Sequence, residues 1–459
     1  MFDLALTGFL AAFLLLGVRR PFLWVLAYLY VDIVSPQRIS YGLLTTVPIS
    51  LITFCLALFG WFFLDKKEGT RLNFRQGLIL VLLVYCGLTT TGADFPEFAQ
   101  YKWSWVWKAL VFAMFLPLTL RTRLRLEAAA LVMVLSVATI IIGGAIKTLF
   151  TGGGYGELHL LVNDNTGLFE GSIISCVAVA IIPLVLWLNR HGTIFPPDAK
   201  VKLFTAALVF ACLLIPVGTQ ARTGLVCAVL LAVLMLRSVK NKALYLLLLP
   251  LGAILAMPLL PSSFTNRMDT IENHESDESA STRVAVWKWT IGYAADHPLG
   301  GGFDSYRSNK ITVQTRKADT NAQGNVNSVV VDETEDRARA FHSAYFEMLG
   351  EQGWPGLMLW LVLQITGLFQ LESVIRRLRR HTDEASRSDA ALATALQQAH
   401  LCYLAGSLFV GIAYQPFIYM LIGLQIGLVE QVRRRLRPAR KVHEPIGGAP
   451  ATGPAPATA

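Results

Sequence analysis

Charged residues are scarce in this sequence. Only 15% of the 459 residues are Asp, Glu, Lys or Arg, whereas 54% are hydrophobic. A soluble domain carries about 25% charged residues, so this composition excludes an ordinary soluble protein. We therefore expect a polytopic membrane protein that satisfies its backbone polar groups inside helices. The first segment lacks a basic start and a small-residue cleavage site, so no removable signal peptide is expected.

Cysteine is rare, and recognisable cofactor motifs are absent. The sequence has no Asp-x-Asp pair, no His-x-x-x-His pair, no phosphate-binding glycine loop and no Gly-x-Ser-x-Gly elbow. These absences predict that the protein uses no metal and no cofactor. The cysteines all fall in apolar segments without metal or redox spacing, and are expected to be small core residues: Cys55, Cys86, Cys176, Cys212, Cys227 and Cys402.

Long apolar runs fill most of the chain, and their lengths predict an all-α fold of about 12 transmembrane helices. The short opening pair allows either two thin spans or one tight hairpin. The expected domains are ten helices in 1–260, a large loop at 261–341, the last helices in 342–436 and a disordered tail at 437–459. The apolar runs are 4–18, 21–34, 47–64, 77–91, 103–120, 128–146, 171–188, 204–217, 224–236, 243–260, 345–371, 399–412 and 416–432.

Positive charge is concentrated in alternate linkers. The formal net charge is +9, and Lys and Arg gather in every second connection between apolar runs. The positive-inside rule places these basic linkers, and the tail, in the cytoplasm. The large loop at 261–341 and the turn Gln220–Gly224 then lie outside. Because membrane topology explains the basic residues, nucleic-acid binding is not expected.

The large loop contains three recognisable parts. Apolar positions 284, 287 and 291 predict a short amphipathic helix that lies along the membrane surface. Glycines 300–302 then predict a turn. The polar stretch 308–334 is expected to be a flexible loop of the kind that serves as a lid over a site. Arg337 and Arg339 follow it, and a helix there would place Arg339 on the same face as His342.

Three residues that are expected on the outer face suit chemistry at a membrane surface. His342 lies where the loop meets an apolar segment, and a neutral imidazole accepts a proton near pH 7. Arg222 is almost the only charge in its outer turn, and Arg283 lies in the predicted surface helix. Arginine binds phosphate oxygens with two parallel hydrogen bonds, so these residues suit the diphosphate of a polyprenyl sugar carrier. The simpler alternatives are an interfacial histidine and an arginine that extends its head to water.

Several motifs resemble the O-antigen ligase and polymerase family of membrane glycosyltransferases. His342-Ser-Ala-Tyr345 through Glu351-Gln-Gly-Trp-Pro-Gly356 is similar to that family's run after its large periplasmic loop. The turn Gln220–Gly224, and Arg283 with Trp287 followed by His297–Gly302, match in the same order. The opening stretch from Arg19 to Arg38 resembles a subgroup of O-glycosylation ligases linked to exosortase systems.

The resemblance implies a GT-C-like, metal-independent, inverting glycosyltransferase of the bacterial inner membrane, with its active site facing the periplasm. It would move a glycan from undecaprenyl diphosphate to the lipid A core or to a protein Ser or Thr. The implied roles are His342 as base, Arg222, Arg283 and Arg339 as diphosphate ligands, and Arg337, Tyr345 and Gln220 as support. Ala221 and Ala344 depart from the polar residues of many members, which leaves the acceptor open. The alternatives are a polymerase, a transporter or flippase for lipid-linked sugar, and a structural assembly partner.

Overall fold

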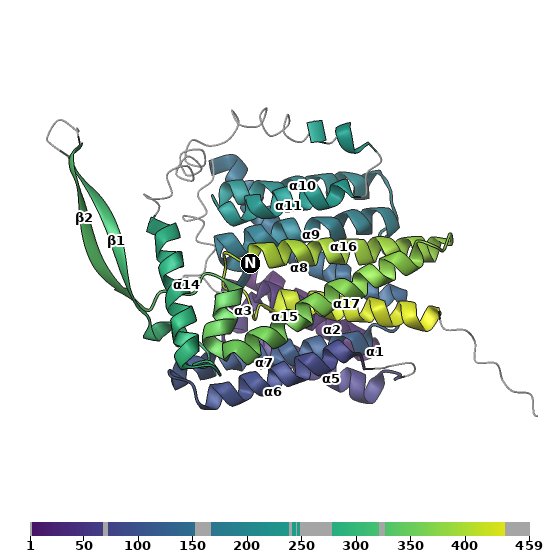
Figure 1. The fold of residues 1–459 in the computed structure, drawn as a ribbon. Helices are drawn as coiled ribbons and strands as arrows, with labels where there is room; N and C mark the ends of the chain where they lie inside the picture. Colours follow the sequence, from purple (N-terminus) through teal and green to yellow (C-terminus); the bar gives the residue numbers. More distant parts are fainter. Residues whose placement is uncertain are drawn as a thin grey trace, which may run out of the picture.

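The computed structural model describes residues 2–67, 72–151, 167–237, 241–244, 246–247, 278–320 and 326–436. Most of the predicted span at 243–260, the loop segment 261–277 and the predicted tail at 437–459 lie outside the described residues. The described chain forms a bundle of helices with one protruding β-hairpin (Figure 1).

The helices follow the predicted apolar runs closely. Their ends are set by local signals: the side chain of Asn73 accepts a hydrogen bond from Arg75 N, while Gln76 returns one to Asn73 N. The helices are α1 (Phe2–Arg19), α2 (Phe22–Val34), α3 (Pro36–Ile39), α4 (Leu43–Thr46), α5 (Ile49–Phe59), α6 (Phe74–Thr91), α7 (Pro96–Thr119), α8 (Arg123–Thr151), α9 (Gly171–His191), α10 (Ala199–Gly218), α11 (Arg222–Leu236), α14 (Glu278–Asp296), α15 (Ala344–Leu378), α16 (Glu384–Gly406) and α17 (Pro416–Arg435). The short turns of helix are η1 (Gly60–Leu64), η2 (Gly167–Phe169) and η5 (Ser305–Ser308).

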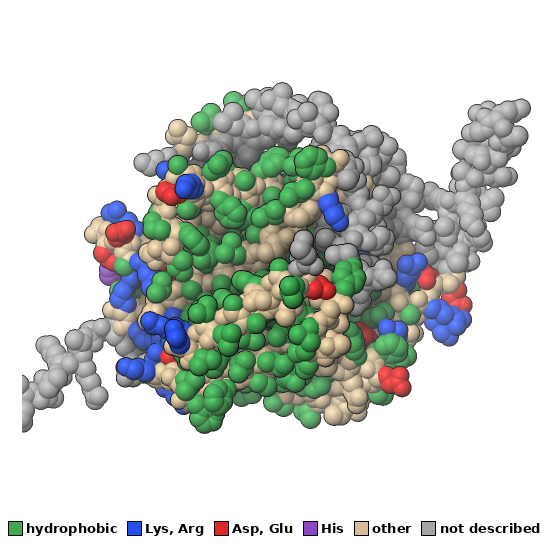
Figure 2. All heavy atoms as spheres, turned by 180° about the vertical axis from the view of Figure 1, so that it is seen from behind, with side chains coloured by type: hydrophobic (Ala, Val, Ile, Leu, Met, Phe, Trp, Pro, Cys, Tyr) green, Lys and Arg blue, Asp and Glu red, His purple; other side chains and the backbone are tan. Residues whose placement is uncertain are grey.

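The bundle has two chemically different ends. We call the end bearing α14 and the starts of α9, α11 and α15 the hairpin end, and the opposite end the basic end (Figure 1). Hydrophobic side chains cover much of the surface between the two ends, while Lys and Arg gather at the basic end (Figure 2). Five described helices are long and apolar enough to cross a membrane: α6, α8, α9, α10 and α15. This supports a helical membrane protein, whereas the total of about 12 spans stays a prediction.

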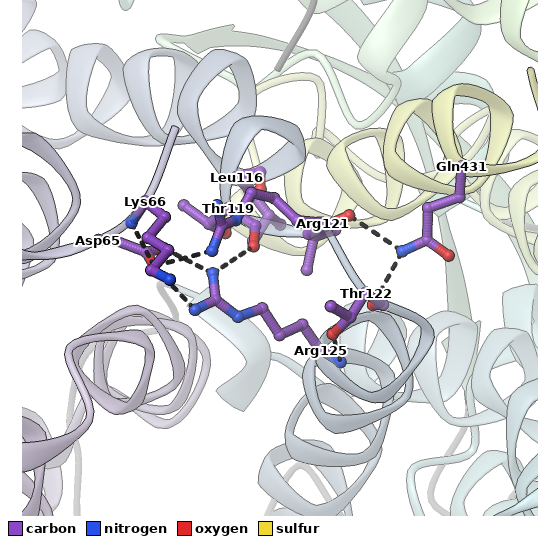
Figure 3. A network of polar contacts seen from close by, with 9 residues as sticks. Asp65, Lys66, Leu116, Thr119, Arg121, Thr122, Arg125 and Gln431 are labelled. Carbon is purple, nitrogen blue, oxygen red and sulfur yellow. Dashed lines mark hydrogen bonds and ion pairs between the residues drawn. The ribbon is translucent and has the colours of Figure 1, made fainter. Parts of the chain in front are cut away.

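Ion pairs close the basic end of the bundle. Asp65, directly after η1, accepts hydrogen bonds from Arg125 Nη2 at 2.9 Å and Arg121 Nη2 at 3.2 Å (Figure 3). Gln431 of α17 donates to the carbonyls of Leu120 and Thr122, both at 2.9 Å. These contacts connect α5, α7, α8 and α17 at a surface where charged groups remain near water.

A chain of buried polar groups lies in the bundle interior and includes Arg75. Arg75 of α6 is fully buried, and its Nη2 donates to Gln425 Oε1 of α17 at 2.9 Å. Gln425 Nε2 lies 3.2 Å from His400 Nδ1, and His400 Nε2 lies 2.8 Å from Gln364 Oε1. The network therefore connects α6, α15, α16 and α17 by hydrogen bonds within the apolar region.

The segment expected to be a flexible loop forms an antiparallel hairpin, so that prediction is wrong. Strand β1 (Lys310–Thr320) pairs with β2 (Val326–Arg337), in a register that places Lys310 opposite Arg337. The hairpin projects from the bundle beside α14 (Figure 1). Its polar sequence hid it, because a two-stranded ribbon that is open on both faces does not require an apolar stripe.

Helix α14 forms where the surface helix was predicted, while its position along the membrane surface stays a prediction. Val284 and Ile291 are 45% and 50% exposed, whereas Val286, Thr290 and Ala294 are buried. Trp287, the third residue of the predicted stripe, stacks on Phe346 of α15. Cys55 is exposed, which corrects its assignment to the core, while the other cysteines are buried.

Candidate active site

His342 occupies a strained position between the hairpin and α15. Its φ is 47°, in the left-handed region, and Ala338 four residues earlier has φ 55°. A non-glycine residue in this conformation costs about 1–3 kcal/mol, and persists only where the surrounding structure imposes it. The backbone around His342 is therefore fixed by its neighbours.

Hydrogen bonds on both sides impose this conformation. Before His342, Trp287 Nε1 of α14 donates to the Phe341 carbonyl at 2.9 Å, and the Phe341 ring is buried. After it, Ala344 N donates to the Ser407 carbonyl at the end of α16, at 2.8 Å. The imidazole thus projects from a segment that α14 and α16 hold from opposite sides.

Asn309 fixes the approach to this segment. It is fully buried at the end of η5, and its side chain forms two hydrogen bonds with the backbone of Arg339. Asn309 Nδ2 donates to the Arg339 carbonyl at 2.7 Å, and Arg339 N donates to Asn309 Oδ1 at 3.0 Å. The stretch between β2 and α15 is therefore not helical, and the helix that was to place Arg339 on the His342 face does not form.

The surroundings of His342 favour the neutral imidazole. The residue is exposed at the surface, but protein atoms crowd its ring and limit its hydration. This burial lowers the pKa of His342, and the positive charges of Arg283 and Arg339 lower it further. At neutral pH the side chain can therefore accept a proton.

Arg283 connects His342 to the start of α9. Besides lowering the pKa of His342, its charge acts on Glu170, the residue before α9. Glu170 caps α9 by accepting a hydrogen bond from Ile173 N at 3.0 Å, and burial raises its pKa. Sequence reasoning missed Glu170, although an acidic residue directly before an apolar helix is a recognisable capping signal.

Arg222 begins α11 in the turn that packs beside the same helix start. Gln220 in this turn has φ 51°, and Thr219 Oγ1 lies 2.7 Å from Ser175 Oγ in the second turn of α9. Gly224 packs against Ser175 so closely that a Cβ there would clash. Arg222 is half-buried and lies at the hairpin end, as Arg283 and His342 do.

The remaining candidates hold structural contacts. Arg339 pairs with Asp336, and Arg337 pairs with Glu335 at 3.3 Å, both at exposed positions. The Tyr345 hydroxyl donates to the Leu404 carbonyl at 3.1 Å, and its ring meets Trp360 edge to face. Tyr345 therefore joins α15 to α16, while Gln220 shapes the turn before Arg222.

Two of the sequence motifs interlock in space. Helix α15 is broken at Gly353, whose φ is 62°, and the turn at 298–302 docks on this break. Gly301 N donates to the Gly350 carbonyl at 3.0 Å, Gly302 N to that of Glu351 at 2.9 Å, and Trp354 N to that of Pro298 at 3.0 Å. Gly300 and Gly353 meet backbone to backbone, leaving no space for a Cβ.

A buried ionic cluster lies directly beneath this junction, and sequence reasoning did not identify it. Lys102 Nζ of α7 lies 2.7 Å from Glu347 Oε1, 2.8 Å from Glu351 Oε1 and 3.9 Å from Asp304 Oδ1. Ala413 N also donates to Glu347 at 2.9 Å, and Asp304 N to Glu351 at 3.0 Å. The available signals were a lysine at the outer edge of a span and two glutamates four residues apart.

Comparisons with known families agree with this organisation. Residues 1–193 match a family of unknown function (DUF5935), and residues 206–361 match the O-antigen ligase family. No curated protein is significantly similar to this chain. Within the described residues, no group of three or more His, Cys, Asp or Glu side chains is arranged to hold a metal. The second match contains Arg222, Arg283 and His342, so residues 206–361 form a domain of the O-antigen ligase family.

Proposed function

We propose that the chain is a metal-independent, inverting glycosyltransferase of the ligase type. Its donor is a glycan on undecaprenyl diphosphate, and its site faces the periplasm of a bacterial inner membrane. The acceptor is the lipid A core oligosaccharide or a protein Ser or Thr. The family supports glycosyltransferase activity in general. The observation that carries the finer proposal is the strained His342, whose pKa is lowered beside two arginines.

The proposed chemistry needs one proton acceptor and stabilisation of one leaving group. His342 removes the proton from the acceptor hydroxyl, whose oxygen attacks the anomeric carbon from the face opposite the diphosphate. The new carbon–oxygen bond forms as the bond to the diphosphate oxygen breaks, and the electron pair leaves with undecaprenyl diphosphate. Arg222 and Arg283 stabilise the charge that develops on this group. Arg339 has a secondary part, because it is already paired with Asp336.

A reconstituted transfer assay tests this function. Purified protein in vesicles receives an undecaprenyl-diphosphate glycan, with lipid A core, an acceptor protein or no second substrate in separate reactions. The variant His342→Asn is informative because Asn tolerates the left-handed conformation but cannot act as the base. We expect transfer to fall by about two to four orders of magnitude.

The control is His381→Asn, which alters an exposed histidine after α15 at the basic end and should leave transfer unchanged. Normal transfer by His342→Asn contradicts the proposal. Glycan chain growth without another acceptor would identify a polymerase. Movement of the donor across the vesicle membrane without any transfer would identify a flippase.

A further inference from the structure

A cavity of about 340 Å³ lies between α8, α9 and α10 at the basic end. This volume is within the range of small-molecule pockets, about 300–1,000 Å³. The lining residues recur with helical spacing, as in Leu131 and Leu135 of α8, Val185 and Leu188 of α9, and Phe204 and Leu208 of α10. The cavity is therefore a continuous apolar slot along three helices, far from the site at the hairpin end.

The polar groups of this cavity gather at one end of it. Lys200, in the first turn of α10, is exposed and belongs to the lining, as do Asn189 and Glu127. Both Glu127 oxygens are occupied, because they accept hydrogen bonds from Thr193 N at 2.5 Å, Thr193 Oγ1 at 2.6 Å and Ile194 N at 2.7 Å. Asn189 Oδ1 is buried, and no group in the described part of the chain donates to it. The end of the slot thus contains the cation of Lys200, the acceptor of Asn189, and the carboxylate of Glu127, whose oxygens already accept three hydrogen bonds.

The slot opens on the surface of a membrane helix bundle. Phe204, in its lining, is 46% exposed, and Phe195 beside Lys200 is 55% exposed. In a bilayer, such an apolar slot meets acyl chains, while basic residues at its end meet lipid phosphates. The start of α10 lies close to Lys200, but it is already capped by Asp198, whose carboxylate accepts a hydrogen bond from Val201 N at 2.7 Å.

We propose that this cavity binds an anionic glycerophospholipid, with one acyl chain in the slot and the phosphate at Lys200. A hydroxyl of the glycerol head group donates to Asn189 Oδ1. The ligand class follows from an apolar slot that ends in a cation and an unoccupied acceptor. Phosphatidylglycerol supplies all three complementary features, whereas phosphatidylcholine has neither the net charge nor the hydrogen-bond donor.

Native mass spectrometry of the purified full chain tests the site. Delipidated protein is titrated with phosphatidylglycerol or with phosphatidylcholine, and retained lipid is counted. The variants are Lys200→Glu, which reverses the head-group charge, and Leu135→Trp, which fills the slot from a half-buried position. We expect each variant to lower retained phosphatidylglycerol by about fivefold or more, with phosphatidylcholine retained weakly throughout.

Two matched controls lie on α10 outside the cavity lining. Lys202→Glu makes the same charge change two residues further on, and Leu203→Trp adds the same ring at a side chain that is 73% exposed. Both should bind as the unaltered protein does. Equal loss in Lys200→Glu and Lys202→Glu, or retention by Leu135→Trp, would show lipid on the surface and overturn the proposal. If Leu135→Trp does not fold, Val201→Phe fills the same slot from α10.

Discussion

The start of α15 carries two charged regions that differ in almost every respect. His342 is exposed, has a strained backbone and lies near cationic neighbours. Lys102, Glu347 and Glu351 form a buried cluster whose groups bind one another and nearby backbone. The two regions therefore have different roles. The buried cluster fixes the start of α15, and this allows His342 just before it to keep a strained backbone conformation at the surface.

Removing the lysine of the buried cluster should have the largest effect on stability. Lys102→Met leaves Glu347 and Glu351 without the ammonium group that lies within 2.8 Å of both. Breaking a buried ion pair in this way costs about 3–5 kcal/mol, because the remaining charges stay desolvated. The thermal unfolding midpoint of the purified protein in detergent should therefore fall strongly.

Two further variants sharpen this result. Arg337→Met removes an exposed pair with Glu335 and should change stability by less than about 1 kcal/mol. The triple variant Lys102→Met, Glu347→Gln, Glu351→Gln removes the charges together and should recover part of the loss. An unchanged unfolding midpoint in Lys102→Met would show that the cluster does not support the start of α15.

Substitutions at the surface region should instead affect transfer more than stability. Arg222→Lys keeps the charge but loses the planar group that binds two phosphate oxygens at once. We expect transfer from the lipid-linked donor to fall by about tenfold to a hundredfold, with an unchanged unfolding midpoint. The control is Arg237→Lys, which makes the same change at the other end of α11, where the arginine pairs with Glu372. Normal transfer by Arg222→Lys would show that Arg222 only extends its guanidinium group to water and does not bind the diphosphate.

The sequence was sufficient for the helices because each one needs an apolar face or an apolar circumference. Helix α9 was expected at 171–188 and is Gly171–His191, and α17 was expected at 416–432 and is Pro416–Arg435. The hairpin at β1 and β2 was missed because the stretch 308–334 is rich in polar residues, which is typical of a loop.

The site was only partly accessible to sequence reasoning. The charge of Arg283 lowers the pKa of His342, while a shared role of the two residues stays a prediction. Asn309 was not recognisable, because its hydrogen bonds to Arg339 join distant segments and leave no local pattern. The capping signal of Glu170 was present in the sequence but was overlooked. Lys102 lies directly before the apolar run at 103–120, and its carboxylate partners become evident only when α7 and α15 are adjacent.

The smallest expected effect concerns the pH dependence of transfer. The proposed base must be neutral, so kcat/KM should fall as the pH drops through the pKa of His342. That pKa is lowered by burial and by the charges of Arg283 and Arg339, which places the acidic limb below the ordinary value of about 6.5. Arg283→Gln removes one of these charges, so the pKa should rise and the limb should move to higher pH.

The pH at which kcat/KM falls distinguishes two roles of Arg283: an electrostatic effect on His342 and a contact with the substrate. A lost phosphate contact lowers the plateau of the pH profile without moving its midpoint, whereas a changed pKa moves the midpoint. Arg337→Gln provides the matched control, because it removes the same charge at an exposed position where the arginine pairs with Glu335. An acidic limb that stays in place in Arg283→Gln, or moves to lower pH, would separate this arginine from the titrating group. The base would then have to be sought elsewhere at the hairpin end.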